Sequence, residues 1–388
     1  MSEFSGALYL KPGQPLTRTL RSTRQAWAQR LAPGHSATAL PGLLAGVFSL
    51  CAQAHRAASQ LALAAAQPSR FAVEPGLAQS LQRETALEHL RRMVLDWPRE
   101  LAPPAQREAF AEQALRSLLS CPLTTTTPGQ GAATWGAMRQ WLHTQWLHMP
   151  AQDWWQAWQQ GGADWLQQWS RSQPGWLPQT LQAARAWDCA LPQLGAKVLR
   201  VHAQPSSLQA LGQALAQDPG LALYPLWQGQ TACTGPWARL GALTPPPLSA
   251  WGLLGSRLAE LVALCLPDWP GQNGAGVLRW GAVQTAPQCG LGWVEMARGL
   301  LIHQVRLEPE SASRGRDPYV LECQVLAPTE WNFHPAGVAA QALAEMPASG
   351  PELRPRVALL MAALDPCVPY HLLEAQGARS SSKERFDA

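Results

Sequence analysis

The hydrophobic pattern of this chain of 388 residues changes near residue 277, and the change limits the folds open to it. Before that point, three stretches have apolar residues at helical spacing: 17–32, 38–67 and 78–119, the last split by Pro103 and Pro104. After it, apolar and alternating runs at 299–308 and 318–326 flank a polar loop, which is typical of a β-hairpin. The sequence therefore predicts an α+β fold that is mostly α.

Shorter signals place the remaining elements. We expect two short strands and two further helices, at 197–202, 221–227, 248–266 and 352–363 respectively. The tail 376–388 is polar and rich in serine, which predicts disorder.

Ten tryptophans lie between Trp135 and Trp187. The four-residue spacings of Trp154 with Trp158 and of Trp165 with Trp169 put each pair on one face of a helix. Indole rings mostly provide buried contact area, so we interpret the tract as a helical core rather than a platform for stacking a ligand. An exposed docking patch for a partner is the alternative.

Charge and hydropathy argue against two classes of partner. The net charge of +4 comes from scattered arginines rather than a basic stripe, so nucleic-acid binding is not expected. No apolar run reaches the roughly 18 residues that span a bilayer, and the first four residues lack the features of a secretory signal. We therefore expect a cytoplasmic protein without a membrane partner.

Eight cysteines are spread along the chain without the clustering of a disulfide framework, and most are expected to be small buried apolar residues. Two stand in local constellations, Cys51-Ala-Gln-Ala-His55 and Asp365-Pro-Cys367-Val-Pro-Tyr-His371. On a helix, Cys51 and His55 would share a face and could meet a soft or borderline metal, although such a pair alone is a weak signal. Gly290-Leu-Gly292 has no third glycine and is not expected to bind a nucleotide.

Four segments, in this order, resemble the motifs of nickel-iron hydrogenase large subunits. They are 31–55, which resembles a motif ending in Cys-x-x-Cys-x-x-x-His; 290–303, which resembles Gly-x-Gly-x-x-Glu-Ala-Pro-Arg-Gly-x-Leu-x-His; 327–335, which resembles Val-Pro-Thr-Thr-Trp-Asn-x-x-Pro; and 365–367, which opens Asp-Pro-Cys-x-x-Cys. The resemblance covers residues 31–67 and 277–375, and the segment 120–276 matches nothing in the family. It implies one large-subunit-like domain over residues 1–375, in which the chain termini meet.

In that family, four thiolates hold nickel and two of them also bridge to an iron that carries carbon monoxide and two cyanides. By the resemblance, Cys51 and Cys367 stand at two of the four positions, whereas Phe48 and Tyr370 replace the other two and Leu373 replaces a histidine. Nickel in such a site depends on sulfur donors, so no nickel is expected. Two thiolates would still suffice for an iron that brings its own carbonyl and cyanide ligands.

The resemblance also implies a pocket for the diatomic ligands. Arg298 and Thr329, the latter after Pro328, match the groups that donate to the cyanides, and His55 matches a histidine beside the bridging sulfur. Ala297 stands where the family has proline. If residues 4–8 align with the family's N-terminal motif, Ser5 replaces a glutamate that relays protons, which argues against turnover of hydrogen.

Loss of half the cysteines resembles the HupK/HoxV group of hydrogenase maturation proteins. The resemblance implies a scaffold, not an enzyme, that transiently holds the iron-carbonyl-dicyanide fragment. Its expected partners are the hydrogenase large-subunit precursor and small accessory maturation chaperones. The alternative is a metal-free chaperone or decoy that binds maturation partners through its large-subunit-like shape. A redox or hydrolytic enzyme is disfavoured because no motif places a general base beside these thiols.

Overall fold

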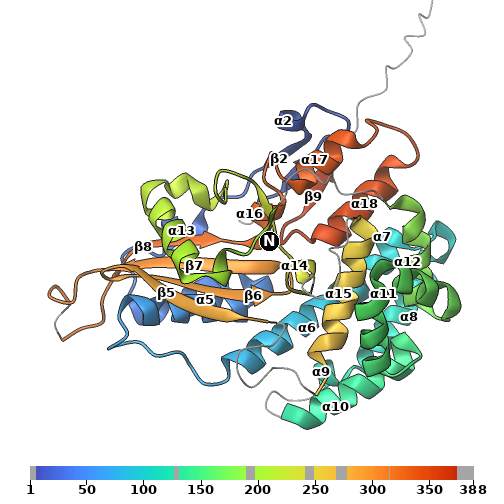
Figure 1. The fold of residues 1–388 in the computed structure, drawn as a ribbon, viewed down its shortest axis with the longest axis horizontal. Coiled ribbons are helices and arrows are strands. Elements are labelled where there is room, and N and C mark those ends of the chain that lie inside the picture. Colours follow the sequence, from blue (N-terminus) through green and yellow to red (C-terminus); the bar gives the residue numbers. More distant parts are fainter. Residues whose placement is uncertain are drawn as a thin grey trace, which may run out of the picture.

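The computed structural model describes residues 6–125, 131–188, 197–240, 249–267, 278–313 and 315–373. An antiparallel sheet with a helix on each face lies beside a larger group of helices, as Figure 1 shows. The sheet has the order β5-β6-β7-β8, formed by β5 (Trp280–Ala286), β6 (Cys289–Met296), β7 (Gly299–Leu307) and β8 (Val320–Leu326). The predicted hairpin is therefore confirmed as β7 and β8, with two further strands that the pattern did not reveal.

Helix α5 (Ala52–Ala66) lies against β6 at unusually close range. A Cβ atom at Gly290 would lie 2.0 Å from the carbonyl oxygen of Ala62, and one at Gly292 would lie 2.3 Å from that of Ala58. Only glycine fits at such a distance, and the alanines of α5 complete the contact. The Gly-x-Gly pair thus has a packing role, which agrees with the expectation that it binds no nucleotide.

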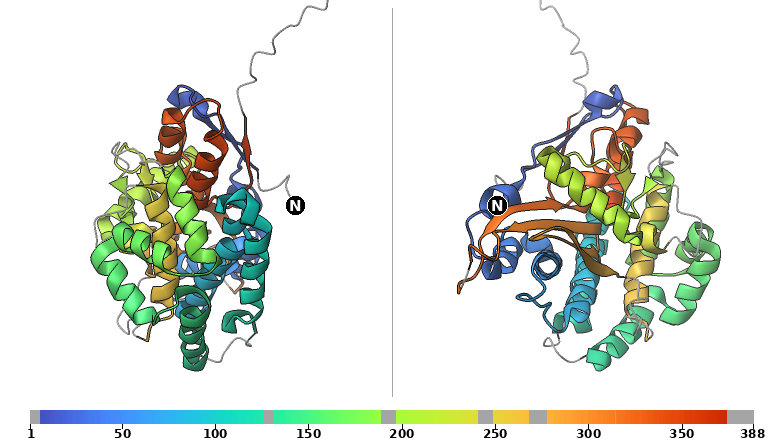
Figure 2. Two further views of the ribbon diagram at one scale, coloured as in Figure 1. Left: turned by 90° about the vertical axis from the view of Figure 1, so that its right-hand side faces the viewer. Right: turned by 60° about the vertical axis from the view of Figure 1, so that its left-hand side comes forward.

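Helix α13 (Pro205–Gln217) covers the opposite face of the sheet (Figure 2). Leu208, Leu211 and Leu215 pack there with Leu291 and Ile302 of the strands. Strand β6 is consequently buried along its whole length. The two helices fix the sheet from both sides, and α5 brings Cys51, which precedes it, to a rigid position.

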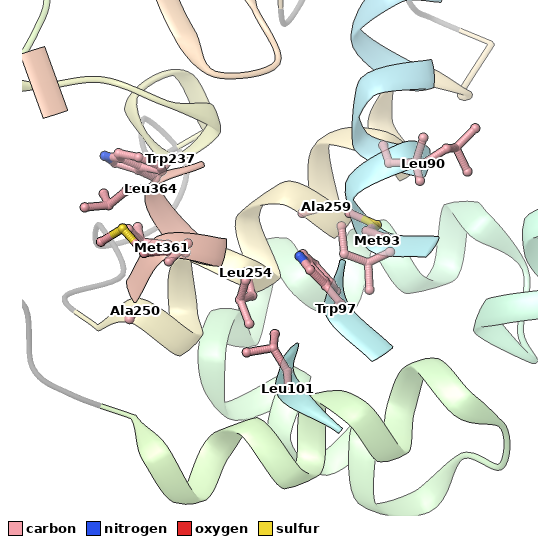
Figure 3. Packing of buried hydrophobic residues seen from close by; sticks show 14 of the residues in the cluster. Leu90, Met93, Trp97, Leu101, Trp237, Ala250, Leu254, Ala259, Met361 and Leu364 are labelled. Carbon is pink, nitrogen blue, oxygen red and sulfur yellow. The ribbon is translucent and has the colours of Figure 1, made fainter. Parts of the chain in front are cut away.

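The group of helices beside the sheet surrounds α15 (Ala250–Leu264), every residue of which is buried. Leu254 and Ala259 of this helix lie among Met93, Trp97 and Met361 from neighbouring helices (Figure 3). The helices up to residue 125 are α2 (Leu16–Thr19), α3 (Trp27–Leu31), α4 (Leu40–Val47), α5, α6 (Leu77–Leu95), α7 (Trp97–Leu101), α8 (Arg107–Leu119) and α9 (Pro122–Thr125). Those that follow are α10 (Gly131–Leu142), α11 (Ala151–Ser172), α12 (Trp176–Ala184), α13, α14 (Pro236–Leu240), α15, α16 (Pro328–Asn332), α17 (Val338–Glu345) and α18 (Leu353–Leu364).

The tryptophan tract forms part of this helical core. The rings of Trp154 and Trp158 stack with centroids 6.0 Å apart, and Trp169 meets Trp154 edge-on at 5.7 Å. Trp146 and Trp176 form another edge contact at 5.4 Å. These five side chains are buried, which confirms the interpretation of the tract as a helical core.

The two ends of the described chain meet in a small sheet. Strand β1 (Leu8–Leu10) pairs antiparallel with β2 (Leu20–Ser22) and parallel with β9 (Tyr370–Leu372). Leu8 lies opposite Tyr370, so residues 362 positions apart are neighbours. The expectation that the termini meet is confirmed.

Several predicted elements differ from the structure. The helix expected at 17–32 is interrupted by β2, because Leu20 pairs with Leu10 and is buried. Helix 38–67 bends at Phe48. Residues 221–227 form no strand, and a 3-10 turn over Pro219–Ala222, capped by the carboxylate of Asp218, overlaps the start of that segment. Only Lys197–Val198 of the expected strand 197–202 is extended, as β3, which pairs with β4 (Ala232–Cys233).

The remaining predicted helices agree with the structure. Helices over 78–119, 248–266 and 352–363 are confirmed as α6 to α8, α15 and α18. The tail 376–388 lies outside the described residues. Within the described part, no single helix is long and apolar enough to cross a bilayer; only α4 and α5 together, which meet at 102°, reach that length and composition.

Candidate metal site

Cys51 lies at the start of α5, where the chain leaves a short 3-10 turn. Its side chain does not cap the helix. The carboxylate of Glu84 on α6 does so instead, accepting hydrogen bonds from the backbone of Gln53 at 2.7 Å and of Ala54 at 2.9 Å. The thiol of Cys51 is thereby not needed as a helix cap, and the residue as a whole is 7% exposed.

Cys367 lies just after α18, at the other end of the chain. Its sulfur accepts hydrogen bonds from Nη1 of Arg24 and from the hydroxyl of Thr329, both at 3.1 Å. The backbone N–H of Cys367 in turn donates to the Thr329 oxygen at 3.2 Å. Such donors stabilise a thiolate, the form in which cysteine binds a metal.

The two cysteines are close enough for their charges to interact. Burial raises the pKa of the Cys51 thiol, the guanidinium of Arg298 opposes that rise, and the charge of Cys367 adds to it. Burial alone would lower the pKa of Arg24, but Cys367, Glu330 and Cys51 together raise it above its usual value. Both arginines thus interact electrostatically with both sulfurs, so Cys51 and Cys367, 316 positions apart, belong to one candidate site.

Arg298 is 1% exposed and is held by two carboxylates. Its Nη2 donates to Glu88 on α6 at 2.8 Å, and its Nε lies 3.4 Å from Asp365. Among the residues described, Nη1 has no hydrogen-bond partner. A buried donor left unpaired costs roughly 1 to 3 kcal/mol, which an incoming acceptor would recover.

Asp365 anchors the loop that carries Cys367. Its carboxylate lies 2.8 Å from Nε of Arg92 and 3.2 Å from Nη1 of Arg257, in addition to Arg298. Burial would raise the pKa of this carboxyl, but the guanidinium groups of Arg298, Arg92 and Arg257 together lower it to about 2. The residue has a φ of +49°, so this ion-pair network also holds a backbone conformation that disfavours most side chains.

His55 lies one helical turn after Cys51. Its Nδ1 is 3.0 Å from Nε2 of His303 on β7, and its ring stacks on Phe48 with centroids 4.2 Å apart. Burial lowers the pKa of His55, with His303 and Arg24 adding to the effect, and burial lowers that of His303 to about 3. Both imidazoles are therefore neutral at physiological pH.

The positions where the family has further cysteines carry no sulfur here. The ring of Phe48 packs on His55, and Tyr370 is part of strand β9. Pro328 is buried at the first turn of α16 and sets the position of Thr329. Ala297 is buried, and its carbonyl accepts a hydrogen bond from Arg257 at 3.1 Å.

Within the described ranges, no three histidine, cysteine, aspartate or glutamate side chains converge as ligands of a bare metal ion. A metal held by Cys51 and Cys367 would therefore have to bring further ligands with it. The described cysteines other than these two are buried, as expected of small apolar residues; they are Cys121, Cys233, Cys265, Cys289 and Cys323.

Sequence reasoning missed several side chains that shape this site, among them Arg24, Glu88 and the carboxylate of Asp365. Arg24 lies in the loop between β2 and α3, outside every quoted motif, and Glu88 is one of several charged residues on α6. Nothing in their local sequence points to the site. Asp365 stands in the quoted Asp-Pro-Cys segment, and its position directly before a candidate ligand was a usable signal.

The fold is that of the nickel-iron hydrogenase large subunit. The structure is similar to a nickel-iron-selenium hydrogenase variant from Desulfovibrio vulgaris Hildenborough, with a TM-score of 0.52 and 15% identity over 90% of this chain and 92% of that one. It is equally similar to the enzyme of Desulfomicrobium baculatum, with a TM-score of 0.52, 13% identity and coverage of 90% and 93%. At these identities the likeness concerns the fold alone.

Sequence comparison identifies the family within this fold. The chain is 36% identical over 373 residues to the hydrogenase expression/formation protein HoxV of Cupriavidus necator, covering 94% of each. It is 29% identical over 375 residues to HupK of Rhizobium leguminosarum bv. viciae, covering 91% of each. The chain belongs to this HoxV/HupK family of hydrogenase expression/formation proteins, which confirms the resemblance seen in its motifs. No protein-family model matches it.

Proposed function

We propose that this chain is a maturation scaffold, not an enzyme, that transiently holds the iron-carbonyl-dicyanide fragment for transfer to the large subunit of a nickel-iron hydrogenase. The observation that carries the proposal is that Cys51 and Cys367, from opposite ends of the chain, lie within electrostatic range of each other and of both Arg24 and Arg298. The cargo is an iron that already has three ligands of its own, so two thiolates complete much of its coordination.

The surrounding groups suit such a cargo. The unpaired Nη1 of Arg298 is a buried donor for the nitrogen of one cyanide. The hydroxyl of Thr329 donates to Cys367 and has only one proton, so a bond to the other cyanide requires it to rotate. His55 faces neutral His303 and orients the start of α5 without adding charge. No nickel is expected, because Phe48 and Tyr370 offer no thiolate.

Binding requires the buried thiol of Cys51 to lose its proton, since the thiolate is the metal ligand. Cys367, with two donors on its sulfur, is the more readily available ligand of the two. Because burial raises the pKa of the Cys51 thiol, this ligand resists deprotonation, which suits temporary storage better than permanent binding. The large-subunit precursor and small accessory maturation chaperones are the proposed partners in this exchange.

The test is the metal content of protein purified without oxygen from cells that make hydrogenase. Iron should accompany the wild type in near-stoichiometric amount and should be lost from Cys51→Ala and from Cys367→Ala. Cys323→Ala, which removes a buried cysteine of strand β8, is the matched control and should keep its iron. Equal iron in all four proteins would show that the proposed ligands are wrong.

An iron-free wild type would favour a metal-free chaperone or decoy, which would use the large-subunit-like shape to occupy a maturation partner. The fold, which covers 90% of the chain, supports this second candidate as well as the first. The two differ in what Cys51 does: a decoy needs no thiol there, whereas a scaffold does.

A further inference from the structure

A groove of about 560 Å³ opens beside the candidate metal site. One wall is formed by β1, α2 and β2, and the other by Tyr224, Pro335 and Leu373. All of these elements belong to the part of the fold where the chain ends meet. A groove of this size is far larger than a single inorganic ion requires.

The groove is basic. Lys11, Arg18 and Arg21 line it, and none of the described residues that line it is acidic. All three cations are exposed, and within the part of the chain described here none of them forms an ion pair. Unpaired charges of one sign in a concave surface attract and orient a partner of the opposite sign.

The same groove presents large apolar side chains to solvent. Tyr224 is 51% exposed and Leu373 is 40% exposed. Small hydrophilic anions gain nothing from such neighbours, whereas a polypeptide that carries both carboxylates and apolar side chains would bury them. The combination of charge and apolar surface therefore favours a peptide segment over a free anion.

The groove leads toward Cys367. Ser22 and Tyr224 line both the groove and a cavity of about 20 Å³ whose walls include Arg24 and Thr329. The backbone N–H of Arg24 donates to the Ser22 hydroxyl at 3.2 Å, and the side chains of Arg24 and Thr329 donate to the Cys367 sulfur. A molecule bound in the groove thus lies two side chains away from the more exposed of the two cysteines.

We propose that the groove docks an acidic, partly apolar segment of the partner protein that exchanges cargo with Cys367. The nature of the cargo rests on the proposed function, but the docking of an acidic segment rests only on the charges and the shape of the groove. Docking there would bring the partner's metal-carrying group to the Arg24 side of the site.

The first test measures binding of a fluorescein-labelled peptide of alternating glutamate and leucine, with a glutamine-leucine peptide as the neutral probe. Fluorescence anisotropy should show the acidic peptide binding to the full chain, more weakly as salt rises. Arg18→Glu combined with Arg21→Glu should weaken binding about tenfold or more. Arg116→Glu with Arg171→Glu, on α8 and α11, changes the net charge equally and should leave binding unchanged.

The second test locates the peptide. The chain has three lysines, Lys11, Lys197 and Lys383, and Lys11 lines the groove. A carbodiimide joins the Lys11 amine to a glutamate carboxylate of the peptide as an amide and takes up the lost water as a urea. Mass spectrometry should find this link at Lys11, and Arg18→Gln with Arg21→Gln, which avoids charge reversal, should reduce it.

Three outcomes would overturn the docking proposal. They are equal peptide binding by the groove variant and its control, links that favour Lys197 over Lys11, and displacement of the peptide by equimolar inorganic phosphate, which would indicate a site for small anions. Metal analysis of the same samples separates the two proposals. A wild type that contains iron but does not bind the peptide refutes only the docking proposal. A wild type that lacks iron but binds the peptide at Lys11 refutes only the iron scaffold.

Discussion

The tryptophan-rich helices and the candidate metal site are both buried, but they are built from opposite materials. In the first, Trp146, Trp154 and Trp169 fill space with stacked and edge-on rings. In the second, Arg298 and Asp365 belong to a network of ions removed from water. Burying ions rarely adds stability over apolar packing, so such a network indicates a role beyond folding. We infer that the tryptophans stabilise the fold and the ionic site serves the ligand.

Loss of a tryptophan should have the largest effect on stability. Trp169 is 1% exposed and its indole N–H donates to the carbonyl of Leu147 at 3.0 Å. Trp169→Ala should lower the free energy of unfolding by about 3 to 5 kcal/mol, because a cavity replaces the ring. Urea denaturation measures this, and iron per folded chain should stay as in the wild type. Loss of iron in the folded variant would contradict the inference that the tryptophans stabilise the fold without a part in the metal site.

Acid should weaken the ionic site by a smaller amount. The pKa of Asp365 is about 2 in the folded protein, below its ordinary value near 4 in an unfolded chain. Its contribution is complete above about pH 4 and is lost as the pH falls toward 2, which amounts to roughly 2 to 3 kcal/mol. Urea denaturation of wild type and Asp365→Asn across this range measures the difference. Parallel curves would show that the Asp365 ion pairs contribute nothing.

A conservative change at Arg298 should affect stability less and cargo more. Arg298→Lys keeps a positive charge between Glu88 and Asp365 but loses the planar fork that serves both. We expect a loss of about 1 to 2 kcal/mol in stability, in the lower part of the range for an unpaired buried donor. Iron content should fall but not vanish, because the thiolates remain. Unchanged iron with the stability loss would assign Arg298 a structural role alone.

The smallest effect on stability is expected at the cysteine itself. Cys51→Ala removes one buried sulfur atom, which we expect to lower the free energy of unfolding by about 1 kcal/mol or less. Its effect on bound iron should nevertheless be complete, which is the reverse of the result for Trp169→Ala. Thermal unfolding and iron analysis on one sample check the small loss of stability and the complete loss of iron. A strongly destabilised Cys51→Ala would place this cysteine among the structural residues.

The sequence motifs predicted most of the residues of the candidate site. The segments around Cys51, Arg298, Thr329 and Cys367 are spread over more than 300 residues, and the structure brings them together as the resemblance implied. The fold class and the amphipathic helices could be predicted because their signals are local and periodic.

Long-range packing explains what the sequence did not reveal. Strand β6 is buried on both faces, so it lacks the alternation by which a half-buried strand is recognised. Strand β2 exists because Leu20 pairs with Leu10 of strand β1, which also pairs with β9 from the other end of the chain, and this pairing overrides the local helical pattern. Arg24 reaches Cys367 across 343 positions, and no local motif encodes such a contact.

Infrared absorption tests the proposed scaffold most directly, on wild type purified without oxygen from cells that make hydrogenase. The cyanide and carbonyl stretching regions should show two bands and one band, with iron but no nickel in the same sample. The bands should be absent from Cys51→Ala prepared in parallel. An empty spectrum and no iron in the wild type, from cells shown to contain active hydrogenase, would contradict the scaffold.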